Sequence, residues 1–308
     1  MPETMPFVSV ILLNYNYAHF LPEAIQSVLA QNYPHFELIL MDDGSSDDSR
    51  RIMQDWVAHA PERIRMITHP DAAHGGIVAS YQRAFGEARG EIVAFLEADD
   101  RWRPENLYRK VEILRRHPDV GVVHSAYRAF GDWKGRLYWH LYALLNHGLE
   151  MPKRQAYCCF GKLLQRNPVA SFSHFVVRKK WLQHVPHLPF FQGNFDWWVL
   201  AHISARAAFY FIPEQLVEWR IHAASAGAGR IDAPRLWKLH RFLQKLYDAL
   251  PLEYLGNAAR AQWVEAQCRH AQIQRAKSWF PWEQILLKPF EAFRLWAHLF
   301  LKNLAVDG

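Results

Sequence analysis

The stretch GEIVAFLEADD, residues 90–100, places an apolar run directly before a cluster of acidic side chains. Residues 92–96 have the length and composition of a buried β-strand, and Glu97, Asp99 and Asp100 follow at once. Carboxylates held this close raise one another's pKa unless a cation or hydrogen-bond donors compensate. Because carboxylates are hard oxygen ligands, the cluster predicts a site for Mg²⁺ or Mn²⁺ that also takes the phosphates of a substrate.

Apolar strands and amphipathic helices alternate on both sides of this stretch. The apolar runs predict strands at residues 7–13, 36–41, 64–67, 92–96 and 120–123. The helical patterns predict helices at residues 21–29, from Ser46 onward, at 77–88 and between Pro104 and Pro118. The alternation predicts an α/β fold with a doubly wound, mainly parallel sheet.

Polar residues stand at the ends of three expected strands. Asn14 and Asn16 follow the first strand, Asp42 and Asp43 the second, and the acidic cluster the fourth. Ligands of doubly wound sheets bind beyond the carboxyl ends of the strands, so we expect these residues to line one crevice. No dinucleotide-binding G-x-G-x-x-G follows the first strand, and no P-loop sequence occurs. A structural alternative, in which the acids only cap turns and helix starts, stays open here.

The composition of the 308 residues favours a folded protein with acidic partners. Half of the residues are hydrophobic, which is enough for a sizeable core. The formal net charge of +6 suits nucleotide diphosphates, phosphate-bearing glycans, nucleic acid or an anionic membrane face. Because no nucleic-acid-binding motif accompanies the charge, we expect no nucleic-acid partner. The adjacent Cys158 and Cys159, with Cys268 and no signal-peptide pattern, favour a reduced, cytoplasmic location.

The N-terminal half resembles the inverting family 2 glycosyltransferases of the GT-A fold. The likeness covers residues 7–125 well and extends more loosely to Ser225. It is carried by residues 8–16, 21–34, 36–39, 42–47 and 90–100, with Pro104 behind. The resemblance implies transfer of a sugar from a nucleotide-diphosphate donor, in the first place a UDP-sugar, with Mn²⁺ or Mg²⁺ as cofactor. The acceptor it implies is a hydroxyl of a glycan or lipid-linked molecule, as in cell-surface polysaccharide synthesis.

The same resemblance implies roles for residues of the donor site. Asp43 is expected to hydrogen-bond the nucleobase, Glu97 to touch the ribose and Asp99 to bind the metal. Further donor-binding positions are expected at Asn14, Asn16, Asp42 and Ala98. Glu97 departs from the family pattern, which usually has Asp at this position. The triplet 79–81, Ala-Ser-Tyr, departs from the family's A-R-N-like triplet, so its donor contacts cannot be transferred.

The segment Phe195-Asp196-Trp197-Trp198 resembles the family's acidic motif on the acceptor side. The resemblance makes Asp196 the general base, and an inverting transfer needs such a carboxylate within hydrogen-bond reach of the acceptor hydroxyl. The family generally has a second acid directly before this residue, where the chain has Phe195. The structural alternative is that Asp196 caps the helix that follows.

Residues 219–225 resemble a family segment in which an Arg-x-His pair faces the diphosphate. Arg220 is therefore expected to contact the donor, and His222 to bind the metal or a phosphate. A single histidine is more often packed or solvated than a ligand, and the chain has 17 of them. A structural role for His222 therefore stays open. The other histidines show no spacing that predicts a zinc site.

We expect three regions along the chain. Residues 1–118 form the donor-binding half of one domain, and residues 119–228 its acceptor-binding and catalytic-base half. Residues 229–308 form a helical C-terminal extension. Within this extension, residues 278–305 are apolar and aromatic, but charges and two prolines interrupt them, which argues against a spanning helix. A peripheral contact with the inner face of the cell membrane, packing on the chain's own core and a homo-oligomer contact stay open.

Two other functions fit parts of the pattern. A catalytically reduced module that keeps the GT-A fold and binds a nucleotide-sugar is the main alternative, because of Glu97 and Phe195. A nucleotidyltransferase would also hold a metal through carboxylates at the end of such a sheet. However, no triphosphate-binding glycine loop is visible in the N-terminal half.

Overall fold

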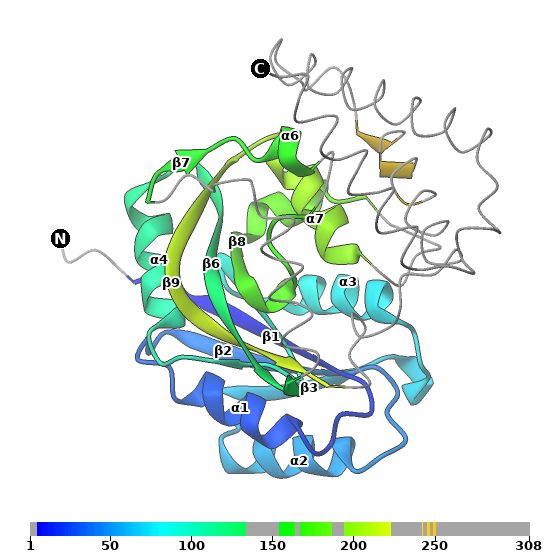
Figure 1. The fold of residues 1–308 in the computed structure, drawn as a ribbon. Coiled ribbons are helices and arrows are strands. Elements are labelled where there is room, and N and C mark those ends of the chain that lie inside the picture. The colour runs from blue at the N-terminus through cyan, green and yellow to red at the C-terminus, as the bar shows by residue number, and fades with distance from the viewer. Residues whose placement is uncertain are drawn as a thin grey trace. The chain divides into compact units, whose positions relative to one another are not determined.

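The structure, a computed structural model, describes residues 5–133, 154–163, 167–186 and 194–222 and five further positions between 242 and 250. The chain divides into two compact units, Met1–Ala228 and Gly229–Gly308. All the elements described below belong to the first unit (Figure 1). The segment 278–305, for which the sequence leaves a membrane or subunit contact open, lies outside the described residues. In the described part of the chain, no helix is long and apolar enough to cross a membrane.

A mixed sheet forms the centre of the first unit, and within the described residues it has nine strands. Eight lie in the order β3-β2-β1-β4-β8-β6-β9-β5, and β7 pairs with β9. The strands are β1 (Val8–Asn14), β2 (Phe36–Asp42), β3 (Ile64–Thr68), β4 (Ile92–Glu97), β5 (Arg101–Trp102), β6 (Val120–Gly131), β7 (Ala156–Tyr157), β8 (Phe175–Arg178) and β9 (Ala208–Ile221). The strands β1 to β4 run parallel, whereas β8 inserts antiparallel between β4 and β6. This confirms the predicted α/β class.

Helices cover both faces of the parallel part of the sheet (Figure 1). They are α1 (Leu21–Leu29), α2 (Ser49–His59), α3 (Ile77–Glu87), α4 (Asn106–Arg116), α6 (Phe160–Leu163) and α7 (Phe195–Ser204), with 3₁₀ turns at Pro70–Ala72, Phe172–His174 and Lys179–His184. Val8, Val10 and Leu12 belong to one core with apolar residues of α1, α2 and α4. On the opposite face, Phe95 packs against two aromatic rings of α3. Covering on both faces explains why these strands are continuously apolar.

The parallel register brings the polar strand ends together. Asn14 of β1 pairs with Asp42 of β2, and Leu13 pairs with Glu97 of β4. The three carboxyl ends therefore lie side by side at one edge of the sheet. This confirms the expected convergence of the polar residues.

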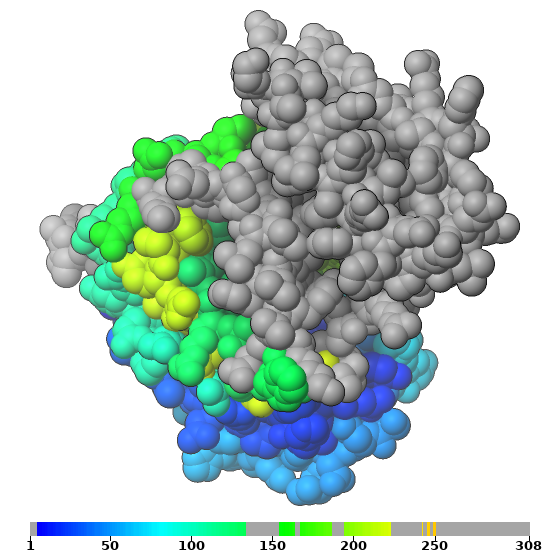
Figure 2. Space-filling model, viewed as in Figure 1, coloured from blue at the N-terminus to red at the C-terminus, as the bar shows by residue number. Residues whose placement is uncertain are grey.

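The second half of the sheet differs from the sequence-based expectation. The apolar pattern predicts only residues 120–123, whereas β6 continues to Gly131, and no pattern predicts β9. Both strands carry half-exposed polar residues in their second halves, and their pairing shifts register near Ala126, so no simple alternation marks them. The space-filling view shows β9, in yellow, at the surface beside green and teal residues (Figure 2). The end of β9 brings Arg220 to the acidic cluster.

Candidate donor and catalytic site

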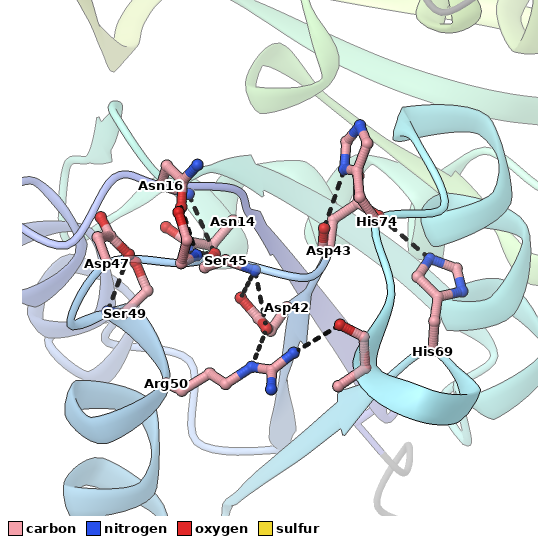
Figure 3. Close-up of polar contacts among 12 residues, drawn as sticks. Asn14, Asn16, Asp42, Asp43, Ser45, Asp47, Ser49, Arg50, His69 and His74 are labelled. Atoms are coloured by element: carbon pink, nitrogen blue, oxygen red, sulfur yellow. Dashed lines mark hydrogen bonds and ion pairs between the residues drawn. The ribbon is translucent and has the colours of Figure 1, made fainter.

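The carboxylate of Asp43 joins two loops at the end of β2. It accepts hydrogen bonds from the backbone N–H groups of Gly75 and Gly76, at 2.8 and 3.0 Å. The Nδ1 atom of His74 lies 3.0 Å from the backbone carbonyl oxygen of Asp43 (Figure 3). Gly44 permits this close approach because its φ is +78°, and a Cβ atom there would lie 2.6 Å from the backbone nitrogen of His74. The two loops are therefore locked together around Asp43.

Two aromatic rings stack beside Asp43. The rings of Tyr15 and His74 have centroids 4.2 Å apart and an interplanar angle of 29°. Tyr15 is 43% exposed. A flat, exposed ring next to a carboxylate suits a nucleobase, which offers a π-face and N–H donors. The geometry thus supports a nucleobase contact at Asp43, which stays a prediction.

The other polar strand ends are engaged within the protein (Figure 3). Asp42 is fully buried and pairs with Arg50 at 2.8 Å. Asn14 donates to the hydroxyl of Ser45 at 3.1 Å, and its own Oδ1 atom has no partner among the described residues. The Oδ1 atom of Asn16 accepts a hydrogen bond from the backbone N–H of Ser46, in the loop after β2, at 2.7 Å. These three residues therefore shape the loop after β2, and their direct contact with a donor stays a prediction.

Asp99 and His222 face each other. The Nε2 atom of His222 lies 3.1 Å from Oδ2 of Asp99, and the two side chains are 16% and 15% exposed. The rings of Tyr17 and Phe20 pack against the imidazole. The structure thus brings together the two residues that the resemblance assigns to the metal.

Arg220 is held by the acidic cluster and its surroundings. Its backbone N–H donates to Asp100 at 2.9 Å, and its Nε donates to the backbone carbonyl of Asp99 at 2.7 Å. Its Nη2 donates to Glu23, and two aromatic rings lie 4.6 and 4.3 Å from the guanidinium. Arg220 therefore fixes the backbone of the cluster, and its predicted contact with the diphosphate stays a prediction.

Glu97 links the cluster with the predicted base. Burial raises the pKa of Glu97 to about 8, and the charges of Asp99 and then Asp196 add to this effect. A hydrogen bond with Ser171 acts in the opposite direction. The predicted ribose-binding acid and the predicted general base therefore interact electrostatically. Ala98, between the acids, is buried, and its backbone N–H donates to β1 at 3.2 Å.

Asp196 is the second residue of α7 rather than its cap. The N-cap position is Asn194, which has a φ of 61°. Backbone N–H groups of Trp197 and Asp196 in the first turn also lower the pKa of this carboxyl, so a structural role at the start of α7 stays open beside the predicted catalytic one. One oxygen of Asp196 accepts a hydrogen bond from Nδ2 of Asn167 at 2.6 Å. Burial raises the pKa of Asp196 to about 6, a value that suits a base working near neutral pH.

Phe195 belongs to an aromatic cluster next to this carboxylate. The cluster consists of Tyr81, Phe85, Phe95, Phe172 and Phe195. Tyr81 stacks on Phe172 at 4.0 Å, and its hydroxyl is buried with no partner among the described residues. Burial raises the pKa of Tyr81, and the charges of Glu97 and Asp196 raise it further. Two departures from the family pattern, Tyr81 and Phe195, therefore lie side by side and close to a third, Glu97.

The pair Asp99 and His222 suits a cation that also binds substrate. Among the described residues, no group of three or more His, Cys, Asp and Glu side chains could form a complete protein cage. Mg²⁺ and Mn²⁺ usually bind through one or two protein ligands, with substrate phosphates and water completing the shell. The partly exposed pair, with the unpartnered Oδ2 atom of Asp100 nearby in the cluster, fits this mode.

The family assignment follows from a comparison of the whole sequence with family models. The model described as glycosyl transferase family 2 matches residues 9–185, which contain the Asp43 loop, the acidic cluster and Ser171. The chain belongs to glycosyl transferase family 2. This confirms the family that the sequence resembles.

Several curated proteins are related to part of this member of the family. An uncharacterised glycosyltransferase of Nostoc is 44% identical over 117 residues, 38% of this chain and 35% of that protein. TuaG of Bacillus subtilis, named for teichuronic acid biosynthesis, is 34% identical over 37% of this chain and 44% of its own. The Escherichia coli UDP-Glc:alpha-D-GlcNAc-diphosphoundecaprenol beta-1,3-glucosyltransferase WfgD is 32% identical over 41% of this chain and 47% of its own. The match thus spans less than half the length of each of these relatives.

Solved structures share the fold over most of the chain. TarS of S. aureus in complex with UDP-GlcNAc superimposes with a TM-score of 0.60 at 15% identity, over 84% of this chain and 72% of TarS. The mannosyltransferase PcManGT of Pyrobaculum calidifontis, in complex with GDP-Man and Mn²⁺, gives a TM-score of 0.56 at 18% identity, over 95% and 84%. These likenesses confirm a GT-A type fold for this member of the family.

Three residues that complete the site carry no sequence signal that we can recognise. Glu23 holds Arg220, Asn167 holds Asp196, and Ser173 contacts the acidic cluster. Serine, asparagine and glutamate are common on helices and loops, so their types alone do not mark a site. Only the fold brings them to the carboxylates.

Proposed function

We propose that this chain is an inverting glycosyltransferase that takes a sugar from a nucleotide-diphosphate donor, a UDP-sugar in the first place. The acceptor is a hydroxyl of a glycan or lipid-linked molecule, in the synthesis of a cell-surface polysaccharide. Residues 1–118 supply the donor-binding half, and residues 119–228 supply the general base. The observation that carries the proposal is the 3.1 Å contact between Asp99 and His222 beyond the carboxyl end of β4, with Arg220 bonded to the backbone of Asp99.

The proposed reaction forms one bond and breaks another at the anomeric carbon of the sugar. The acceptor oxygen bonds to this carbon while the bond from the carbon to the diphosphate oxygen breaks. Asp196 takes the proton of the acceptor hydroxyl, and the nucleoside diphosphate leaves with the electron pair. Asn167 orients the carboxylate of Asp196 through the 2.6 Å hydrogen bond.

The donor is proposed to lie along the polar edge of the sheet. Asp43 hydrogen-bonds the nucleobase beside Tyr15, Glu97 contacts the ribose, and Asp99 with His222 holds a divalent cation. When bound, Mn²⁺ or Mg²⁺ would neutralise the charge that develops on the leaving diphosphate. Arg220 keeps the backbone of Asp99 in place through its 2.7 Å hydrogen bond.

The related proteins support the substrate classes without identifying the substrates. WfgD is named for a UDP-Glc donor and the TarS structure is a complex with UDP-GlcNAc, whereas PcManGT is in complex with GDP-Man and Mn²⁺. WfgD acts on a diphosphoundecaprenol-linked sugar, and TuaG is named for teichuronic acid. A uridine nucleotide, a lipid-linked glycan acceptor and a divalent cation are therefore our first choices.

A donor screen tests the proposal. The full chain is incubated with UDP-, GDP- and dTDP-sugars, with Mn²⁺ or with EDTA, and thermal unfolding and release of nucleoside diphosphate are measured. We expect one donor with Mn²⁺ to raise the unfolding midpoint, because a ligand that binds only the folded state stabilises it. Asp196→Asn should bind that donor and not turn it over, whereas Asp55→Asn, which alters an exposed carboxylate on α2, should behave as the unaltered chain. Full turnover by Asp196→Asn would disprove the assignment of the base.

The main alternative is a nucleotide-sugar-binding module without turnover. The observation in its favour is Phe195, which is buried in the aromatic cluster where the family generally has an acid. Donor binding with no product across a broad panel of glycan and lipid-linked acceptors would favour this alternative. Release of pyrophosphate instead of a nucleoside diphosphate would indicate a nucleotidyltransferase.

A further inference from the structure

Two arginines next to the acidic cluster share one glutamate. Glu23, in the first turn of α1, accepts a hydrogen bond from Nη1 of Arg101 with its Oε1 atom. It accepts another from Nη2 of Arg220 with its Oε2 atom, and both contacts are ion pairs. Arg101 belongs to β5 and Arg220 to β9, so the carboxylate of one helix residue joins two strands. We call these three residues the arginine bridge.

The two guanidinium groups of the bridge lie against the same aromatic ring. Their central carbon atoms are 4.4 Å (Arg101) and 4.3 Å (Arg220) from the ring centroid of Phe130. The guanidinium of Arg220 also lies 4.6 Å from the ring of Phe20. Two positive charges on one ring repel each other, and the carboxylate of Glu23 offsets this repulsion because it contacts both.

Arg220 connects the bridge with the proposed cation site. Its Nε donates to the backbone carbonyl of Asp99 at 2.7 Å, and its backbone N–H donates to Oδ1 of Asp100 at 2.9 Å. The carboxylate of Asp99 lies 3.1 Å from Nε2 of His222, which follows Arg220 by two residues in the chain. Arg220 thus contacts the backbone of one proposed metal ligand and lies close in the chain to the other. A shift of its guanidinium would therefore change the geometry of the pair.

Arg101 has a second acidic partner, whereas the guanidinium of Arg220 has none within the part of the chain that the structure describes. Nε of Arg101 donates to Glu218, and the backbones of these two residues pair in the antiparallel ladder of β5 and β9. Arg101 would therefore stay in place without Glu23. Arg220 would lose its ion pair, and the other arginine would repel it.

We propose that Glu23 is a positioning residue for the cation site, and that it acts through the guanidinium of Arg220 on the backbone of Asp99. The charge-assisted hydrogen bond from Arg220 to Glu23 fixes the plane of the guanidinium, so that Nε meets the carbonyl of Asp99. The inference rests on the proposed function, because it assumes that Asp99 and His222 bind a divalent cation together with a nucleoside diphosphate.

Substitution of Glu23 tests this inference in the full chain. The probes are UDP and GDP, and whichever the unaltered chain binds more tightly is added at a saturating concentration. Titration with Mn²⁺, with the free ion measured by electron paramagnetic resonance, then gives the Kd of Mn²⁺. Glu23→Gln keeps the shape of the side chain but has no charge and cannot offer an acceptor oxygen to each arginine. It should raise the Kd of Mn²⁺ by about tenfold, as expected when the support of a metal ligand is lost.

Glu214→Gln is the matched control. Oε1 of Glu214 also accepts hydrogen bonds from two arginines, Arg109 at 2.8 Å and Arg154 at 3.1 Å. The side chains of Glu23 and Glu214 are 41% and 34% exposed, so the two substitutions remove similar carboxylates. Because Glu214 is not bonded to Arg220 or to the acidic cluster, Glu214→Gln should leave the Kd of Mn²⁺ within about twofold of the unaltered chain. A similar rise in both variants would indicate an effect of net charge and would count against positioning.

A double-substitution cycle shows whether Glu23 acts through Arg220. Arg220→Gln should itself raise the Kd of Mn²⁺, and adding Glu23→Gln should then change it by less than about twofold. Effects that multiply, or a Kd in Glu23→Gln equal to that of the unaltered chain, would overturn the inference.

Thermal unfolding checks that each variant is folded. If Glu23→Gln does not fold, Glu23→Asp takes its place, because it withdraws the carboxylate by one methylene group. The Kd of Mn²⁺ should then rise about threefold or more, and an unchanged value counts against the inference. If the unaltered chain binds no Mn²⁺ with either nucleotide, the proposed function fails and the inference fails with it. If the unaltered chain binds Mn²⁺ and the Glu23 variant matches it, only the inference fails.

Discussion

His222 places its Nε2 atom 3.1 Å from the carboxylate of Asp99, although 123 residues separate the two in the chain. The long strand β9 makes this contact possible, because it ends beside the acidic cluster that follows β4. The pair is partly exposed and lies next to Arg220, which binds the backbone of Asp99. It is therefore the part of the described protein best suited to a cation and a diphosphate.

The first prediction concerns this pair. Asp99→Ala should lower Mn²⁺-dependent donor turnover by about a hundredfold or more, because the proposed metal ligand and its charge would be lost together. His222→Ala should lower it by about tenfold and raise the Mn²⁺ concentration needed for half-maximal rate, since one of two ligands remains. Initial rates across a Mn²⁺ titration measure both effects. An unchanged Mn²⁺ dependence in Asp99→Ala would place the cation elsewhere.

The second prediction concerns the pH dependence of transfer. Because the pKa of Asp196 is raised to about 6, the base is protonated below that pH and ionised above it. The rate should therefore fall about tenfold per pH unit below pH 6 and level off above it. Measurement of kcat between pH 5 and 7.5 shows this fall in rate at low pH. In Asp196→Asn the pH dependence should vanish, and the rate should be lower by about a hundredfold or more.

The third prediction concerns how the charge of Asp196 affects the stability of the folded protein. Burial raises the pKa of Asp196 from 3.8 to about 6 in the folded protein, so the folded state binds the proton more tightly than the unfolded state. Ionised Asp196 therefore destabilises the fold, and this cost grows from pH 4 to pH 6 and then stays constant. Asp196→Asn, which can still accept from Asn167, should unfold at a higher temperature than the unaltered chain at pH 7.5 and at a similar one at pH 4. A lower midpoint at pH 7.5 would contradict the predicted cost.

The fourth prediction concerns the loop around Asp43. Gly44→Ala should destabilise the fold by about 1–3 kcal/mol, because Gly44 has a φ of +78° and a Cβ atom would lie 2.6 Å from a backbone nitrogen. It should also weaken nucleotide binding, since the loop carries Asp43. Gly86→Ala is the matched control: it lies within α3, has nothing within 4 Å of a new Cβ atom, and should be neutral or stabilising. Urea unfolding of both variants decides whether the backbone conformation matters.

The fifth prediction concerns the acid that the family generally has before the base. Phe195→Glu should not restore a family-like site, because Phe195 is 1% exposed and packs in the aromatic cluster. Loss of the ring and burial of a carboxylate should destabilise the fold by about 3–5 kcal/mol. Phe195→Leu should cost clearly less, since it keeps an apolar side chain. Chemical unfolding compares the two, and a stable, more active Phe195→Glu would refute the structural role.

Local patterns predict the donor half of the fold well. The helix expected at residues 21–29 matches α1, Leu21–Leu29, because an amphipathic pattern and a proline in the first turn both act within the segment. The strands from β1 to β4 are apolar throughout because both faces of the sheet are covered. The convergence of Asn14, Asp42 and Glu97 follows from parallel strands ending at one edge.

The acceptor half is less predictable for a physical reason. The burial pattern of β9 is irregular, its pairing with β6 shifts register, and its sequence contains Pro213. Strand formation there depends on neighbouring strands rather than on local alternation. Within the expected acceptor-binding half, residues 119–228, the rings of Phe172 and Phe175 are buried in the core.

The amino-acid sequence alone determined the parallel donor half, the acidic cluster at the end of its fourth strand and the family resemblance. These features depend on residue types and spacings within single segments. Only the tertiary structure decided that Asp99 faces His222, that Arg220 bonds to the backbone of Asp99, and that Ser173 accepts the backbone N–H of Glu97. Contacts such as these join residues 76 to 123 positions apart, and no local pattern specifies which distant side chains the folded sheet brings together.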